Sequence, residues 1–389
     1  FFSIIGKTFF PASSDFAQTL QRLADFAIGF ITRPIGGIVF GYIGDRYGRR
    51  VSLIFSMLGM TIPTFSIGLI PSYEEIGIYA TIMLVILRLF QGLCISGEGT
   101  GAAIFVLEHQ NNLRPGFITG LVHGSNIAGT IIAQLVGIFI NNYFPDIDYA
   151  WRFAFLLGGF MGMVGFYLRL RVSETPIFES LSEKKRTLKA PFVHVLKNSW
   201  KSMFLTFAVA GFTSSIFYMV KTYVNVFYSD VMHFDKNLSL WYSSYAALVL
   251  MVCIPLAGMV VDNIGKIKVI YFAITASIIF SVPVLIGMSS EVFLVRMISL
   301  TSLSILSASM SGAAYIFVIS LFKPEERFSG VAFSYNFGIC VFGGTSPIVS
   351  RALVEFTGLY YSPAFYIIGT ASMFLIIMLA MRKIAQKAA

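Results

Sequence analysis

Charged residues are scarce in this sequence. They account for 12% of its 389 residues, whereas about one-quarter of the residues of a soluble domain are charged. Cysteine is rarer still, and Cys94, Cys253 and Cys340 each fall inside an apolar stretch, which predicts no disulfide framework. The four histidines share no ligand spacing, and no nucleophile elbow or glycine-rich phosphate loop is present. We therefore expect no enzyme activity, no cofactor and no metal site.

Long hydrophobic runs make up most of the chain. Hydrophobic residues reach 56% of the total, and the mean hydropathy is +0.78. A helix needs about 20 apolar residues to cross ~30 Å of hydrocarbon at roughly 1.5 Å per residue. Stretches of about that length, with few or no charges, cover residues 24–44, 51–70, 76–96, 116–140, 153–168, 203–228, 238–261, 269–288, 297–322, 328–350 and 361–381. We therefore predict an all-α polytopic membrane protein.

One charged turn occurs twice in the chain. The segment from Gly41 to Arg50 returns between Gly258 and Lys268 with its glycines, acid and base matched. Such self-similarity indicates a duplicated unit. When the second copy is laid on the first, residues 1–10 correspond to the end of a helix whose beginning is missing. We predict twelve transmembrane helices, the first one truncated, in two six-helix halves at 1–171 and 201–389 with a charged linker at 172–200.

Lysine and arginine are distributed unequally between the two sides of the predicted membrane. One side has only Lys7, Arg22, Arg152 and Lys236. The other side holds the bases of the linker together with Arg46, Arg49, Arg50, Arg114, Lys266, Lys268, Lys323, Arg327, Arg382, Lys383 and Lys387. Because short cytoplasmic loops carry the excess of bases, we predict that the linker and the C-terminus are cytoplasmic. Topology thus accounts for the net charge of +9, and no nucleic-acid partner is predicted.

The repeated turn also carries a family resemblance. Residues 41–50 resemble the signature loop between the second and third helices of the major facilitator superfamily. The segments that resemble its metabolite:proton symporter branch are 33–37, 88–92, 96–98, 151–152, 169–176 and 342–347. Residues 71–78 and 100–106 look most like those of proline/betaine transporters. The resemblance implies the major facilitator fold, solute transport, and a multi-pass monomer in the lipid bilayer of a bacterial inner membrane.

Through this resemblance, the signature loop is identified as a cytoplasmic gate. Its acid and bases could bind the end of a facing helix in one conformation and release it in the other. A topology anchor is the alternative, and it explains the arginines but not an acid between glycines. The predicted gating residues are Gly41, Asp45, Arg46, Gly48, Arg49, Arg50 and Asp262.

Polar residues recur at helical spacing in three of the predicted spans. The sets are Thr119, His123, Asn126, Thr130 and Gln134; Ser214, Tyr218, Lys221 and Asn225; and Ser304, Ser307, Ser311 and Tyr315. Steps of three or four residues place each set on one helix face, which predicts a shared aqueous path. Hydrogen bonds between helices are the alternative for any single hydroxyl. Beside the first set, Gly116, Gly120 and Gly124 form a face that lets another helix approach closely.

Ionisable residues inside the spans are the candidates for function. A charge at mid-bilayer costs about 2.5–3.5 kcal/mol even on lenient scales, so it persists where water, a partner or function compensates it. Glu98 and His123 are predicted to couple the proton. The residues predicted to bind the solute are Arg33, Arg88, Asn126, Tyr218, Lys221, Tyr315 and Tyr335. Helix packing is the alternative for Arg33 and Arg88.

The candidates favour a proton-coupled symporter that works by alternating access between the two halves. A cationic anchor beside aromatic walls suits a zwitterion such as proline or glycine betaine. The predicted walls are Phe217, Tyr218, Tyr315 and Tyr335. A di- or tricarboxylate is the alternative solute, because Arg33, Arg88 and Lys221 outnumber the acids that could neutralise them. A sensor without flux is a further alternative, although we expect no signalling domain.

Overall fold

The computed structural model describes residues 8–9, 29–110, 114–144, 147 and 149–387, and these contain helices and no strand. The longer helices are α3 (Arg33–Arg46), α4 (Arg49–Ile67), α6 (Ile78–His109), α7 (Pro115–Tyr143), α8 (Ala150–Leu170), α11 (Trp200–Tyr218), α13 (Lys236–Ile264), α14 (Lys266–Met288), α15 (Phe293–Ser320), α16 (Arg327–Gly338), α17 (Ser346–Thr357) and α18 (Pro363–Ala380). The short ones are α5 (Tyr73–Ile76), α9 (Pro176–Glu183), α10 (Pro191–Asn198), α12 (Val224–Val226) and α19 (Arg382–Lys387), with π-helical turns η1 (Met219–Tyr223), η2 (Phe227–Val231) and η3 (Ile339–Gly343).

Ten helical stretches of the described residues are long and apolar enough to cross a membrane. They match ten of the predicted spans, with α11 to η2 forming one crossing and α16 to α17 another. The remaining predicted span, 24–44, is represented by α3, and its first residues lie outside the described part of the chain. The predicted helix end at 1–10 also lies outside it, apart from residues 8–9. The prediction of an all-α membrane fold is confirmed.

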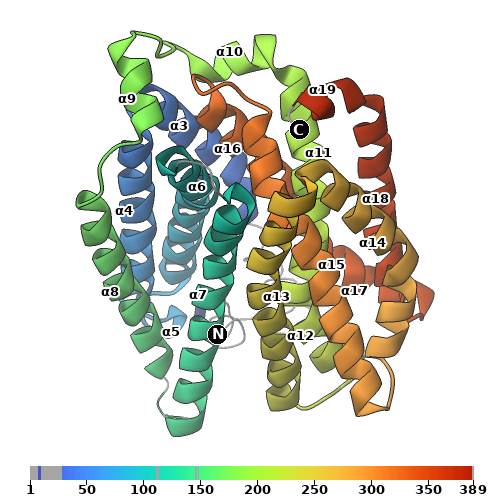
Figure 1. The fold of residues 1–389 in the computed structure, drawn as a ribbon. Coiled ribbons are helices and arrows are strands. Elements are labelled where there is room, and N and C mark those ends of the chain that lie inside the picture. The colour runs from blue at the N-terminus through green and yellow to red at the C-terminus, as the bar shows by residue number, and fades with distance from the viewer. Residues whose placement is uncertain (1–7, 10–28, 111–113, 145–146, 148, 388–389) are drawn as a thin grey trace.

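The long helices form two groups that lie side by side. Figure 1 shows α4, α6, α7 and α8 on one side and α13, α14, α15 and α18 on the other. The groups meet where α7 packs on α13 and α3 packs on α16. α7 and α13 lie close together near the end that carries α9, α10 and α19, and they diverge toward the opposite end (Figure 1). We call the end with α9, α10 and α19 the charged end.

Glycines allow the two groups to approach backbone to backbone. A Cβ atom on Gly120 of α7 would lie 2.9 Å from Cα of Pro255 in α13. A Cβ on Gly41 of α3 would lie 2.7 Å from Cα of Ser329 in α16. Because real Cβ atoms do not come so close to backbone, neither position accepts a larger residue. The close approach predicted for the glycine face of α7 is thereby confirmed.

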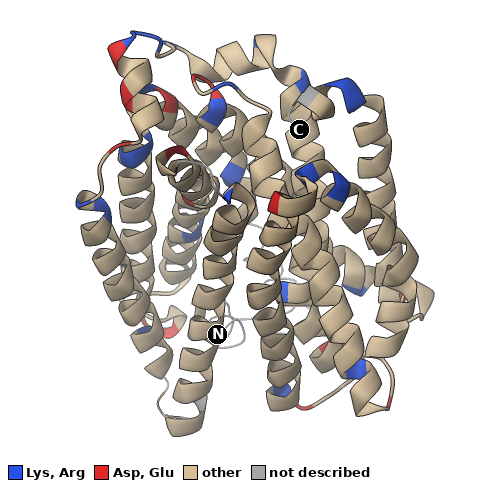
Figure 2. Ribbon diagram, viewed as in Figure 1, with Lys and Arg blue, Asp and Glu red and all other residues tan. Residues whose placement is uncertain are grey.

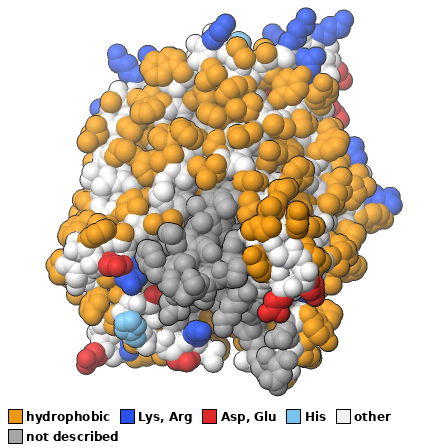
Figure 3. Space-filling view, turned by 180° about the vertical axis from the view of Figure 1, so that it is seen from behind, with side chains coloured by type: hydrophobic (Ala, Val, Ile, Leu, Met, Phe, Trp, Pro, Cys, Tyr) orange, Lys and Arg blue, Asp and Glu red, His pale blue; other side chains and the backbone are white. Residues whose placement is uncertain are grey.

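Charge and hydrophobicity are segregated along the molecule. Figure 2 shows lysine and arginine concentrated toward the charged end. From behind, hydrophobic side chains cover the middle of the described surface, with lysine and arginine along the upper edge (Figure 3). Large apolar side chains such as Trp241 and Phe272 are 73% and 64% exposed. An apolar outer face of this kind suits contact with lipid, since hydrocarbon tails cannot solvate polar groups.

Candidate functional site

Aromatic side chains from four helices meet between the two helix groups. The ring of His123 in α7 lies between Phe217 of α11 and Tyr315 of α15, with centroid distances of 5.1 and 4.9 Å. The ring of Tyr315 contacts Tyr335 of α16 at 5.1 Å, and Tyr218 lies 5.5 Å from Phe217. We call these residues the aromatic cluster: His123, Phe217, Tyr218, Tyr315 and Tyr335. Because aromatic faces attract cations, the cluster is suited to an ammonium group.

Two cationic side chains border the aromatic cluster. Nη1 of Arg33 donates to the Tyr218 hydroxyl at 3.3 Å, and the Arg33 guanidinium stacks 3.9 Å from the ring centroid of Phe30. Nζ of Lys221 lies 5.8 Å from the ring centroid of Phe217. Among the described residues, no carboxylate forms an ion pair with Arg33 or Lys221. Both side chains are half-buried, and a cation in such a place favours a carboxylate within hydrogen-bond distance, so a solute carboxylate can pair with them.

Irregular helix geometry positions Lys221 and Tyr218. The helix that begins as α11 passes into the π-helical turn η1, which contains Lys221. Such turns are frequent at functional sites, because the extra residue changes the direction of the side chains that follow. The turn η3 follows α16, and its Gly343 faces Tyr218: a Cβ there would lie 2.9 Å from the Tyr218 ring. The backbone of η3 therefore supports one wall of the aromatic cluster.

His123 has one hydrogen-bond contact that fixes its ring. The side chain is 6% exposed, and its Nδ1 lies 3.4 Å from the carbonyl oxygen of Ser311 in α15. A carbonyl oxygen can only accept, so we assign the hydrogen of the neutral ring to Nδ1. Nε2 then presents a lone pair that can take a proton. The proton-coupling role predicted for His123 stays a prediction.

The structure does not bring Glu98 or Arg88 to the aromatic cluster. Glu98 of α6 forms a bidentate ion pair with Arg169 of α8, with one N–O distance of 2.9 Å. Ser56 of α4 donates to the same carboxylate at 3.2 Å. The Arg88 guanidinium lies 5.8 Å from the ring centroid of Phe155 in α8. Glu98 thus faces α4 and α8, and Arg88 faces α8. Their predicted roles in coupling and binding stay predictions.

The polar stripes divide into two parts. Asn126 follows His123 by one turn on α7, and it is exposed. Farther along the same stripe, Gln134 accepts a hydrogen bond from a serine of α13 at 3.4 Å. On α15, Ser304 donates to a carbonyl oxygen of α13 at 3.0 Å. The packing alternative therefore holds for Gln134 and Ser304, whereas Ser311 of the α15 stripe meets His123 of the aromatic cluster through its carbonyl oxygen.

The signature turn joins the two helix groups at the charged end. The carboxylate oxygens of Asp45 accept from the backbone N–H groups of Phe328 and Ser329 at 3.1 and 2.8 Å. The carboxylate thus caps the N-terminus of α16, where the helix dipole favours an anion. Asp262 does the same at the N-terminus of α7, accepting from Gly116 and the next residue at 2.6 and 2.9 Å. The two copies of the turn thus make matching contacts, each with the N-terminus of a helix far away in the sequence.

Arg49 extends this cap into a buried charge network. Its Nη1 lies 3.4 Å from a carboxylate oxygen of Asp45, and its Nε donates to Glu108 at 3.1 Å. The side chains of Arg49 and Asp45 are 0% exposed and that of Glu108 is 1% exposed. Arg327 of α16 donates to the other oxygen of Glu108 at 2.9 Å. The network therefore ties α3, α4 and α6 to the second helix group.

Sequence reasoning missed Glu108 and Arg327 as partners. The predicted span ended at residue 96, whereas α6 continues to His109. The glycines that lower hydropathy beyond residue 96 are packing positions: Gly97 lies against Phe40 and Gly101 against Phe328. The sequence did contain a signal for the longer helix: Glu108 follows Gly101 by about two helical turns.

The other residues of the signature turn contact the segment between α8 and α11. Nη1 of Arg46 donates to the carbonyl oxygen of Lys189 at 3.4 Å, and the backbone N–H of Arg50 donates to Glu174 at 3.0 Å. Gly48 has a φ of 125°, a conformation that favours glycine, and a Cβ there would clash with the Glu174 carboxylate. Burial raises the pKa of Glu174, which lies beyond the end of α8, although the backbone N–H groups it accepts from act against that rise.

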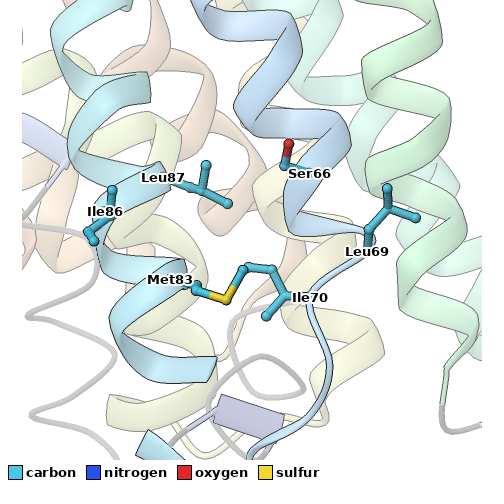
Figure 4. Close-up of a pocket in the computed structure, with 6 residues that line it drawn as sticks. All are labelled: Ser66, Leu69, Ile70, Met83, Ile86 and Leu87. Carbon is cyan, nitrogen blue, oxygen red and sulfur yellow. The ribbon is translucent and has the colours of Figure 1, made fainter. Parts of the chain in front are cut away.

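A cavity of about 400 Å³ lies elsewhere, between the ends of α4 and α6 (Figure 4). Its lining is Ser66, Leu69, Ile70, Met83, Ile86 and Leu87. This lining offers one hydroxyl and no charged group, so it cannot pair with either charge of a zwitterion. The cavity is therefore not the candidate solute site.

Two groups of membrane-spanning helices, with a polar and aromatic site between them and matching carboxylate caps at one end, define a polytopic solute transporter. The family model of the Major Facilitator Superfamily matches residues 7–299, and the chain belongs to this superfamily. The resemblance seen in the signature turn is thereby confirmed.

Curated relatives are similar over nearly the whole chain. The sequence is 31% identical to a glycine betaine/proline/ectoine/pipecolic acid transporter of Dickeya dadantii and 29% identical to a proline/betaine transporter of Escherichia coli, in each case over 98% of this chain and 79% of the relative. It is 32% identical to a putative proline/betaine transporter of Staphylococcus aureus, over 93% and 79%. A solved proton:xylose symporter matches with a TM-score of 0.74 at 16% identity, over 98% of this chain and 90% of that one, which supports the fold.

Proposed function

We propose that this protein is a proton-coupled symporter that imports a small zwitterion such as proline or glycine betaine, and that it is not an enzyme. The names of the curated relatives support this solute class. The two helix groups would alternate the access of the aromatic cluster to either side of the membrane. The protein would act as a monomer in a bacterial inner membrane, with residues 172–200 and the C-terminus in the cytoplasm.

The observation that carries the proposal is the aromatic cluster beside Arg33. The planar guanidinium of Arg33 can hold a carboxylate through two hydrogen bonds. The ring faces of Tyr315 and Tyr335 can hold a quaternary or secondary ammonium, for about 1–2 kcal/mol in a desolvated site. A zwitterion such as glycine betaine carries both groups on one short chain.

A di- or tricarboxylate is the second candidate solute. The observation in its favour is the presence of two cations, Arg33 and Lys221, with no carboxylate paired to either within the described residues. Each cation could then take one carboxylate of the solute.

Lys221→Gln separates the two solute classes. For a dicarboxylate, the substitution leaves one buried carboxylate without a counter-charge, which should cost about 2 kcal/mol and weaken apparent affinity at least ~tenfold. For a zwitterion held by Arg33, the loss should stay below about threefold. Competition of proline, glycine betaine, succinate and citrate with labelled solute, measured on both proteins, gives the affinities.

Arg33→Gln serves as the comparison, because it should weaken either class of solute strongly. A large, carboxylate-selective loss in Lys221→Gln would overturn the zwitterion proposal. Inhibition by betaine or proline that Lys221→Gln hardly alters, and that Arg33→Gln removes, is the expected result.

His123→Ala tests the proton-coupling role proposed for this histidine. Histidine is the side chain that ordinarily changes charge between about pH 5 and 8, so the pH dependence of transport should flatten over that range. His109→Ala is a matched control, because His109 contacts the carbonyl oxygen of Phe105 within α6, apart from the aromatic cluster. An unchanged pH profile with a lower yield of folded His123→Ala would assign the residue a structural role.

A further inference from the structure

A second cavity lies near the charged end, over α4 and between α6 and α8. Its volume is about 120 Å³. α4 and α8 each supply an arginine to its lining, Arg50 and Arg169. The apolar part of the lining is Leu53, Ala102, Phe105, Val106 and Val172. This cavity combines two arginines with apolar side chains, which distinguishes it from the aromatic cluster and from the apolar cavity of Figure 4.

Only one of the two guanidinium groups at this cavity pairs with a carboxylate among the described residues. Arg169 is paired with Glu98, but Arg50 forms no ion pair with a described carboxylate. Glu174 accepts from the backbone N–H of Arg50 at 3.0 Å, but its carboxylate forms no ion pair with the Arg50 guanidinium. Nη2 of Arg50 donates to the carbonyl oxygen of Leu170 at 2.7 Å, and its Nε is buried without a hydrogen-bond partner in the described chain. Because a buried donor without a partner is costly, the guanidinium that forms no ion pair and its open Nε point to an anion with several oxygens.

The position of the cavity selects the kind of anion. Arg50 is the second residue of α4, and Arg169 is the second-last residue of α8. Both therefore lie where membrane spans end, at the depth of lipid phosphates. Phe105 and Val106 of α6 lie beside them and offer apolar surface that an acyl chain can cover. A soluble phosphate would use the arginines but not this surface.

We propose that this cavity is a binding site for the phosphate group of an anionic phospholipid in the cytoplasmic leaflet. The choice of leaflet rests on the proposed topology, whereas the binding chemistry does not. The Arg50 and Arg169 guanidinium groups bind the phosphate oxygens as planar forks. One acyl chain lies along α6 and α8 over Leu53. An anionic headgroup is preferred over a zwitterionic one, because the Arg50 guanidinium forms no ion pair with a described carboxylate, whereas a zwitterionic headgroup brings its own ammonium group to the phosphate.

The experiment measures retention of lipid by the purified full-length chain. Native mass spectrometry with added phosphatidylglycerol or phosphatidylethanolamine gives the dissociation constant of each. Arg50→Gln removes the unpaired charge, and Ala102→Phe fills the cavity without changing any charge. Arg171→Gln is the matched control, because Arg171 is exposed and bonded to the Tyr167 hydroxyl at 2.9 Å, outside the lining. Each protein is taken from the monodisperse fraction.

We expect phosphatidylglycerol to bind at least ~tenfold more tightly than phosphatidylethanolamine in the unmodified chain. Arg50→Gln and Ala102→Phe should each remove that preference, and Arg171→Gln should keep it. An equal preference in all four proteins would overturn the proposal. So would displacement of the lipid by inorganic phosphate at similar concentration, since that result would mark a site for a free anion. Ala102→Phe keeps the test decisive if Arg50→Gln fails to fold.

Discussion

Replacing Arg49 with methionine should open the charged end of the transporter. The substitution leaves Asp45 and Glu108 buried without the guanidinium that both contact. Breaking a buried ion pair by removing one partner costs about 3–5 kcal/mol. We take the lower end, because Arg327 still pairs with Glu108. The ratio of molecules closed at the charged end to molecules open there should therefore fall by about a hundredfold, because each ~1.4 kcal/mol changes an equilibrium constant tenfold.

A distance between spin labels reports this change directly. Tyr47 follows α3 and Lys323 follows α15, and both are exposed, so labels there should move apart in Arg49→Met. Lys266→Met is the matched control, because Lys266 holds the equivalent place in the repeat. It donates to the Ser320 hydroxyl at an exposed position, where charge contacts contribute little. A wild-type distance distribution in Arg49→Met would contradict the proposed gate.

Glu98→Gln should abolish accumulation of solute against its gradient, while exchange of solute across the membrane persists at least in part. A carboxylate inside a span is rare and is a common proton carrier. Glutamine keeps the size of Glu98 and can still accept from Ser56, but it cannot gain or lose a proton. Accumulation driven by an imposed proton gradient and solute counterflow, both measured in proteoliposomes, separate the two activities.

The ion pair with Arg169 requires its own control. If Glu98 serves only to hold Arg169, then Arg169→Gln should impair transport as strongly, and the double variant Glu98→Gln/Arg169→Gln should recover accumulation. If Glu98 carries the proton, the double variant stays uncoupled. Wild-type accumulation in Glu98→Gln or in the double variant would remove Glu98 from the coupling mechanism.

The spans and the helix seams could be predicted because they depend on local composition. A run of apolar residues such as 269–288 becomes α14 whatever its neighbours are, because hydrocarbon leaves no other way to satisfy the backbone. Gly120 at helical spacing from Gly116 predicted a close helix approach, since only a missing side chain permits one. The repeat likewise predicted that Asp45 and Asp262 would have equivalent places.

The partners of charged residues could not be predicted, because they come from distant parts of the chain. Arg88 and Glu98 share a face of α6, but the sequence does not show that this face meets α8. Arg169 of α8, the partner of Glu98, is 71 residues away along the chain. Glu108 was missed because hydropathy falls along the glycines of α6, although the helix continues. The π-helical turn around Lys221 has no signature in composition, since it arises where packing shifts the register of one helical turn.

Uptake of labelled glycine betaine and proline into proteoliposomes that contain the purified chain tests the central claim most directly. We expect accumulation above equilibrium only when the interior is more alkaline than the exterior, with loss of accumulation on adding a protonophore. Succinate and citrate should neither accumulate nor compete. Accumulation without a proton gradient, or uptake of succinate with exclusion of betaine and proline, would contradict the account.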